Sequence, residues 1–132
     1  MNKLTGQIKH IESTLSMSVV DISVGKDTFS VIVIDTPKSA NYLKNAQPIN
    51  LLFKETEVVL AKNLTTPLSI PNRFKGKITH INEDKLLTQI TINYQQTSII
   101  SMIITTAYKN LNIKTGDEID WLIESNEIIL SL

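Results

Sequence analysis

The sequence contains no cysteine, so it can form neither a disulfide framework nor a thiolate metal site. It has no excess of charge, because 13 basic residues balance 13 acidic ones. This balance argues against a general attraction to nucleic acid or to an anionic membrane. No apolar run approaches membrane-spanning length, and the first six residues lack the apolar core of a signal peptide. We therefore expect a soluble, cytoplasmic protein.

Catalytic motifs are also missing: there is no nucleophile motif, P-loop or dinucleotide-binding glycine fingerprint. His10 and His80 have no cysteine or carboxylate pair at ligand spacing nearby, so we interpret them as structural, with a ligand pair as the alternative. The few aromatic residues are not clustered as in single-strand-binding barrels, and we assign Trp121 and Phe53 to the core. The sequence predicts no enzyme, metal site or cofactor.

What the chain does contain is an internal repeat. Residues 2–11 resemble residues 72–81, with Asn, Gly, Ile, His and Ile recurring at a constant offset, 72 − 2 = 70. The same offset pairs residues 2–62 with residues 72–132 without a gap. The sequence therefore predicts a first domain at 1–62, a connector at 63–71 and a second domain at 72–132.

Each repeat has the pattern of five short strands and one brief turn or helix. In the first repeat, Asp35, Thr36 and Pro37 predict a helix start, and the helix would end near Leu43. The continuous apolar stretch 29–34 predicts a strand buried on both faces, and Gly6 suggests a bulge or bend. The expected strands lie at 4–11, 18–24, 29–34, 49–54 and 58–62, and then at 74–81, 88–94, 98–104, 118–124 and 128–132, with a turn or helix near 106–111.

These patterns predict a fold class. Many short strands with one short helix per repeat are typical of small closed barrels. We expect an all-β protein with two tandem OB-like five-stranded β-barrels, each carrying one short helix or helical turn.

Three stretches resemble the molybdate-binding Mop (TOBE) family. Residues 68–78, Leu-Ser-Ile-Pro-Asn-Arg-Phe-Lys-Gly-Lys-Ile, resemble its opening Ser-Ala-Arg-Asn followed at fixed spacing by a large apolar residue, Gly, and Val or Ile. Residues 112–119, Asn-Ile-Lys-Thr-Gly-Asp-Glu-Ile, resemble its Leu-x-x-Gly-Asp-Glu-Val turn, and residues 54–60 resemble its closing hairpin. The resemblance covers essentially the whole chain, twice, as in a stand-alone tandem molbindin.

The resemblance implies a cytoplasmic, non-catalytic protein that binds molybdate, with tungstate as a second ligand, in molybdenum storage or homeostasis. It also implies a homo-oligomer, with a trimer favoured, and oxyanion sites at domain and subunit interfaces. Hydroxyls, backbone N–H groups and one or two cations can hold a tetrahedral dianion, so a balanced net charge is no objection.

Candidate oxyanion ligands in the opening motif are Ser69 and Asn72. The family's Arg falls on Pro71, which removes a cation, and Arg73 is the compensating candidate. Strand alternation allows Arg73 to face either side.

The short helix of the first repeat supplies Thr36 and Ser39, and the closing hairpin supplies Lys54. A cap role without ligand binding is the alternative for Thr36. In the second repeat the candidates are Thr105 or Thr106, and Ser125.

Two residues weaken the match of the second repeat to the family's ligand set. Lys109 stands at the counterpart of Ser39, and Glu124 at the counterpart of Lys54. Because a carboxylate repels a dianion, we expect fewer or altered sites unless Glu124 turns away. One alternative is a degenerate Mop interaction module that binds another small anion. The other is an OB-type nucleic-acid-binding protein, whose binding would be tight and salt-sensitive.

Overall fold

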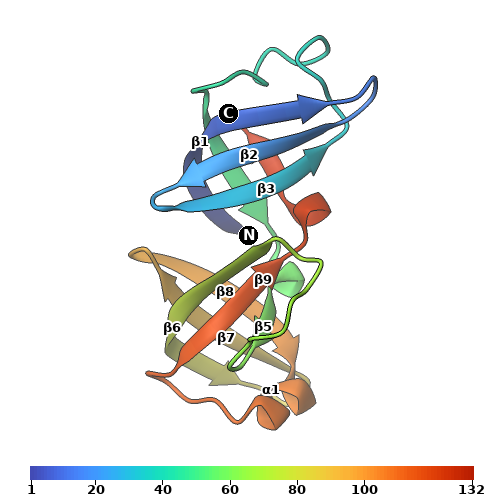
Figure 1. Cartoon of the computed structure of the whole chain (residues 1–132). Helices are drawn as coiled ribbons and strands as arrows, with labels where there is room; N and C mark the ends of the chain where they lie inside the picture. The colour runs from blue at the N-terminus through green and yellow to red at the C-terminus, as the bar shows by residue number, and fades with distance from the viewer.

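The structure is a computed structural model that describes residues 1–132. It consists of two curved, antiparallel five-stranded sheets stacked end to end (Figure 1). The first sheet contains β1 (Asn2–Ser13), β2 (Ser18–Val24), β3 (Asp27–Val33), β4 (Pro48–Phe53) and β10 (Ile129–Ser131). The second contains β5 (Val59–Ala61), β6 (Asn72–Glu83), β7 (Leu87–Tyr94), β8 (Thr97–Ile104) and β9 (Glu118–Ile123). The predicted all-β fold with two OB-like units is confirmed.

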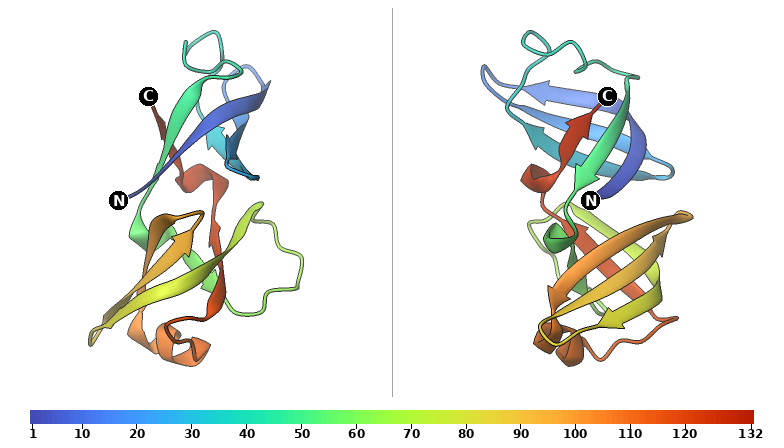
Figure 2. Two further views of the ribbon diagram at one scale, coloured as in Figure 1. Left: turned by 90° about the vertical axis from the view of Figure 1, so that its left-hand side faces the viewer. Right: turned by 180° about the vertical axis from the view of Figure 1, so that it is seen from behind.

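Each sheet takes one edge strand from the other half of the chain. The strand orders are β10-β4-β1-β2-β3 and β5-β9-β6-β7-β8. The short 3-10 turn Glu55–Glu57 carries the chain from β4 across to β5, where Leu60 lies opposite Trp121. In the same way, the turn Ser125–Glu127 leads from β9 to β10, and β10 pairs with β4 in the first sheet. Figure 2 shows β4 and β10 side by side. The two units are therefore interlocked by their own backbone pairing.

The bulge lies beyond the predicted glycine. The register of β1 against β2 shifts between Ile8 and His10, and the second copy repeats the shift between Ile78 and His80. A Cβ on Gly6 would lie 2.5 Å from the carbonyl oxygen of Ser23. The prediction of a bulge at Gly6 is wrong, because this glycine permits β2 to approach closely.

Strand β3 is buried on one face. Phe29 and Val31 are completely buried, whereas Ile32 is 37% exposed and Ile34, just past the strand, is 87% exposed. The prediction that residues 29–34 are buried on both faces is wrong. The reason is that β3 is an edge strand of a curved sheet, which covers only its inner face.

The two copies differ at the predicted helix. The second copy forms α1 (Thr105–Leu111), as expected. Residues 35–43 form successive turns, with the N–H groups of Ser39 and Ala40 both donating to Thr36 O at 2.9 Å, so the helix predicted there is wrong. The Ser39 hydroxyl accepts from Thr36 N–H at 2.9 Å, and such local side-chain bonds compete with helix formation.

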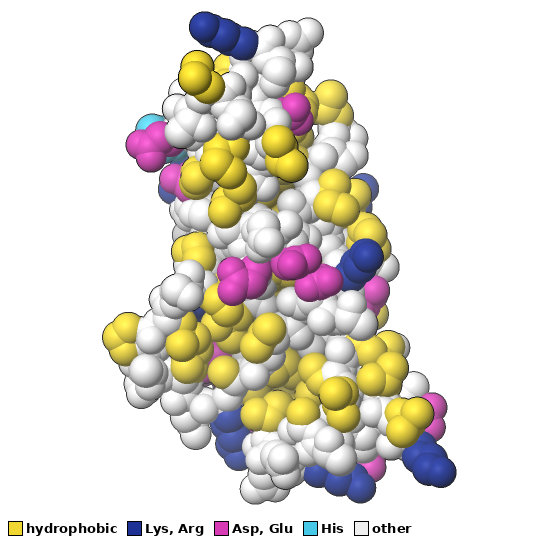
Figure 3. Space-filling view, turned by 90° about the vertical axis from the view of Figure 1, so that its right-hand side faces the viewer, with side chains coloured by type: hydrophobic (Ala, Val, Ile, Leu, Met, Phe, Trp, Pro, Cys, Tyr) yellow, Lys and Arg dark blue, Asp and Glu magenta, His cyan; other side chains and the backbone are white.

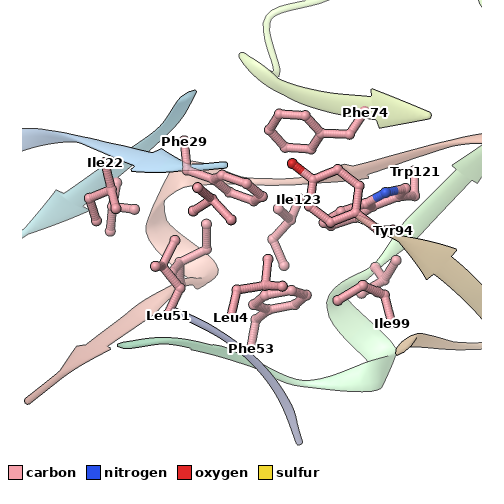
Figure 4. Packing of buried hydrophobic residues seen from close by; sticks show 14 of the residues in the cluster. Leu4, Ile22, Phe29, Leu51, Phe53, Phe74, Tyr94, Ile99, Trp121 and Ile123 are labelled. Carbon is pink, nitrogen blue, oxygen red and sulfur yellow. The ribbon is translucent and has the colours of Figure 1, made fainter. Parts of the chain in front are cut away.

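One hydrophobic core runs across the junction between the sheets (Figure 4). The ring centroids of Phe29 and Phe74 are 4.2 Å apart, and those of Tyr94 and Trp121 are 5.1 Å apart. The core positions predicted for Trp121 and Phe53 are confirmed, since both are completely buried. Each aromatic residue of this cluster has an aliphatic counterpart 70 positions away: Phe29 and Ile99, Phe53 and Ile123, Phe74 and Leu4, Tyr94 and Val24, Trp121 and Leu51. None of the helices is long and apolar enough to cross a membrane.

Candidate functional site

Asn72 forms a clamp between the two sheets. It is completely buried, and its Nδ2 donates to Ser30 O at 2.9 Å and to Ile123 O at 3.1 Å. Its Oδ1 accepts from Ser30 N–H at 2.8 Å. Asn2 makes the equivalent pair of bonds to the backbone of Ile100, both at 2.8 Å. Both N–H groups of the Asn72 amide are therefore engaged inside the protein.

Arg73 faces away from Asn72, as expected for neighbours on a strand. It is half-buried, its Nη1 donates to Thr66 O at 3.3 Å, and it lines a polar cavity of about 530 Å³. Ser69 lies exposed in the segment between β5 and β6. Sequence analysis grouped these three residues, and the structure gives them three different surroundings.

The closing turns lie at the junction between the sheets. Lys54 is exposed directly after β4, and its counterpart Glu124 is exposed directly after β9. Asn72, the first residue of β6, pairs with Ile123. Glu124 and Ser125 directly follow Ile123, so they lie next to the start of β6. Ser125 is 7% exposed, in a turn that packs against β3. Glu124 is therefore as accessible to solvent as Lys54.

The loop after β3 holds a group of hydroxyls. Thr36 lines a cavity of about 230 Å³ together with Ser13, Thr14 and Lys38. Ser39 is exposed and accepts from Thr36 N–H, so that N–H group is occupied. An anion here would be held by hydroxyls and an ammonium group, without the N–H groups of a helix start.

The equivalent place in the second copy is acidic. The counterparts of Ser13 and Thr14, 70 positions on, are Glu83 and Asp84. Thr105 is buried, and its hydroxyl donates to Asp84 O at 2.7 Å. Thr106 is exposed, and Lys109 Nζ lies 3.8 Å from the Glu83 carboxylate. Lys109 partly offsets this charge, and in the first copy the acidic residue Asp35 directly precedes Thr36.

The predicted ligands occupy separate places in one chain. Thr36 follows Ser30 by six residues, 36 − 30 = 6, which is roughly 20 Å of extended chain. Figure 1 shows the loop that contains Thr36 at the outer end of the first sheet, while Asn72 and Lys54 lie at the junction. A single chain does not bring the outer-end hydroxyls to Lys54.

A polar cluster that the sequence did not predict lies around Arg73. Tyr94 Oη donates to Asp27 Oδ2 at 2.7 Å, and Gln95 Nε2 donates to the same oxygen at 3.2 Å. Burial raises the pKa of Tyr94 far above its usual value, and the bond to Asp27 adds to this. The cluster has no motif, since its members come from both halves of the chain. The only sign of it in the sequence is that most charged residues of this cavity have an uncharged counterpart 70 positions away.

The fold defines a class: tandem OB-like barrels with exchanged edge strands. Residues 68–130 match the family model of the TOBE domain. The fold is similar to a crystal structure of the cytoplasmic molybdate-binding protein ModG with molybdate bound, with a TM-score of 0.90 at 22% identity. That likeness covers 99% of this chain and 95% of the other. The predicted resemblance to TOBE domains and to a tandem molybdate-binding protein is confirmed, and no curated protein sequence matches significantly.

Proposed function

We propose that the protein binds molybdate, with tungstate as a second ligand, and serves in cytoplasmic molybdenum storage or homeostasis without catalysis. The observation that carries this proposal is the likeness to ModG over 99% of the chain, at a TM-score of 0.90. The TOBE match of residues 68–130 supports it independently.

The outer end of the first sheet supplies one part of the donor set. Ser13, Thr14, Thr36 and Lys38 line a cavity of about 230 Å³. The Ser13 hydroxyl donates to Ser18 Oγ, because Ser18 itself donates to Asp35 O, so the donors for an anion are Thr14, Thr36 and Lys38. Hydroxyl and ammonium donors form strong, charge-assisted hydrogen bonds to a dianion. Since sulfate carries the same charge, discrimination against it would come from the size and fixed geometry of the site.

The junction supplies the other part, and a second copy of the chain would unite the two. Lys54 and Ser125 lie at the junction, apart from the loop of Thr36 and Ser39. A neighbouring copy that docks its outer end against this junction would complete a site of hydroxyls and a cation. The expected homo-oligomer, with a trimer favoured by the family resemblance, would need this docking between copies.

An apolar surface supports such association. A groove of about 640 Å³ between β5, β8 and α1 is lined by nine hydrophobic residues, and Figure 3 shows hydrophobic side chains gathered over this half of the molecule. Val59 and Ile104 in it are 48% and 62% exposed. Their counterparts in the first half, Ile129 and Ile34, are 53% and 87% exposed. Apolar patches of this kind mark contact surfaces, and two related ones on each chain suit self-association.

Calorimetric titration with molybdate, tungstate and sulfate tests the function, on protein whose mass is measured by light scattering. We expect saturable binding of the first two ions and none of sulfate. Thr36→Val should weaken molybdate binding about tenfold, whereas Thr65→Val, in the exposed connector, should leave it unchanged. Failure of molybdate to bind the wild-type protein would overturn the proposal.

A surface variant tests the association. Ile104→Asp should shift the protein towards the monomer and lower molybdate affinity with it, because a carboxylate is costly in an apolar interface. Leu86→Asp is the matched control, since Leu86 is 75% exposed on a hairpin and does not line the groove. A monomeric wild-type protein that still binds molybdate would contradict the shared site.

A further inference from the structure

The polar cavity beside Arg73 lies at the junction and is separate from the outer-end hydroxyls. Its walls are the β2–β3 hairpin, the β7–β8 hairpin, β6 and the segment between β5 and β6. Lys26, Arg73 and Lys75 line it, and the rings of Phe74 and Tyr94 form an apolar part of the wall. Its volume of about 530 Å³ falls in the range of small-molecule sites.

The two carboxylates in this cavity are already satisfied by the protein. Asp27 accepts from Tyr94 Oη at 2.7 Å and from Gln95 Nε2 at 3.2 Å. Asp120 accepts from Lys75 Nζ at 3.2 Å and from Leu64 N–H at 3.1 Å.

Two cations are left over. Neither Lys26 nor Arg73 takes part in any ion pair of the chain. The guanidinium of Arg73 makes one long bond, 3.3 Å, to Thr66 O, which leaves most of its N–H donors free. With three cations against two carboxylates, the lining of the cavity carries one net positive charge, 3 − 2 = 1.

This charged set exists only once in the duplicated chain. Seventy positions away, Lys26 and Lys75 are replaced by Gln96 and Thr5, and only Arg73 keeps a cation, Lys3. The two carboxylates are likewise replaced, Asp27 by Thr97 and Asp120 by Asn50. The repeat fold itself therefore does not require these charges in both copies.

We propose that this junction cavity binds a small organic anion that carries more than one carboxylate or phosphate group. Arg73 would bind one such group in the two-pronged manner of guanidinium, and Lys26 would bind another from the opposite wall. The rings of Phe74 and Tyr94 would contact its carbon atoms. The site is wider than a tetrahedral oxyanion needs, and it assigns Arg73 to a ligand other than molybdate.

Titration of the whole protein with citrate and with pyrophosphate tests the proposal and separates carboxylate from phosphate ligands. We expect at least one to bind saturably, and Arg73→Gln and Lys26→Gln each to weaken it about tenfold. Lys3→Gln is the matched control, because Lys3 is the counterpart of Arg73 outside the cavity, and it should leave binding unchanged. The emission of Trp121, whose ring centroid lies 5.1 Å from that of Tyr94, gives a second readout.

Three outcomes would overturn the proposal. The first is the absence of citrate and pyrophosphate binding by the wild-type protein, and the second is an equal loss of binding in the Lys3→Gln control. The third is a loss of molybdate binding in Arg73→Gln, which would make the cavity part of the oxyanion site. The proposal is supported if Arg73→Gln weakens the binding of citrate or pyrophosphate and leaves molybdate binding unchanged. This result does not depend on what Thr36→Val does to molybdate binding.

Discussion

The side-chain amide of Asn72 exchanges two hydrogen bonds with the backbone of Ser30, at 2.8 and 2.9 Å. Ser30 lies on β3, the edge strand of the first sheet, and Asn72 opens β6 in the second. The side-chain amide thus makes to edge strand β3 the backbone hydrogen bonds that a neighbouring strand would otherwise make. Asn2 does the same for Ile100 on edge strand β8, so each sheet protects one edge of the other.

Asn72→Ala should lower the free energy of unfolding by about 3 kcal/mol. The substitution leaves the N–H and C=O of the half-buried Ser30 without their partners. Urea denaturation followed by Trp121 emission would measure the loss. Asn2→Ala, which removes two hydrogen bonds instead of three, should cost less. A change within about 0.5 kcal/mol, as at an ordinary surface position, would contradict the clamp.

Gly76→Ala should destabilise the protein by about 3 kcal/mol, because the added Cβ would lie 2.3 Å from Ile92 Cγ2. Ile92 is completely buried and has no room to shift. Gly116→Ala is the comparison: nothing lies within 4 Å, and only its positive φ of 96° opposes the change. We expect a loss of about 1 to 2 kcal/mol there. Thermal unfolding measures the loss of stability in both variants. A larger loss in Gly116→Ala than in Gly76→Ala would show that the close approach of β7 to Gly76 is not what makes this glycine necessary.

The stability of the protein should fall at alkaline pH through Tyr94. Burial, and then the bond to Asp27, raises the pKa of Tyr94 above its usual value, so the folded state keeps the proton where the unfolded state releases it. This contribution is complete below about pH 10 and is lost as the pH rises above it. Tyr94→Phe should flatten the decline above about pH 10 in urea denaturation, after a loss of about 1 kcal/mol at neutral pH.

Tyr42→Phe is the control for that series. Burial and the bond to Asp35 raise the pKa of Tyr42 too, but its side chain is less enclosed than that of Tyr94. Its removal should therefore flatten the decline less. An equal effect of the two variants would count against a special role for the junction.

Glu124→Lys should strengthen molybdate binding about tenfold or add a site. Glu124 is the counterpart of Lys54, 124 − 54 = 70, and the change replaces a repelling charge with an attracting one. Glu118→Lys alters the net charge equally at the other end of β9 and serves as the control. Calorimetry of both variants measures affinity and stoichiometry. The same gain in both would mean that net charge alone is responsible.

The duplication, most strands and the core positions of Trp121 and Phe53 could be read from the residues alone. These features depend on a constant offset and on the spacing of apolar side chains along the chain, and both are local properties. The motif residues Ser69, Asn72 and Arg73 were found in this way as well. Their separate surroundings were not, because strand alternation sends neighbours to opposite faces and the partners of each face lie far away in sequence.

The exchange of edge strands is the clearest feature that depended on the folded chain. Val59–Ala61 and Ile129–Ser131 are equally short and apolar, and each could pair with β4 or with β9. The direction in which the chain leaves each 3-10 turn determines which strand, β4 or β9, it pairs with. The sequence of a three-residue strand does not predict that direction. The burial of β3 on one face and the charged cavity at the junction follow from the same assembly, since both depend on which elements from the other half lie beside them.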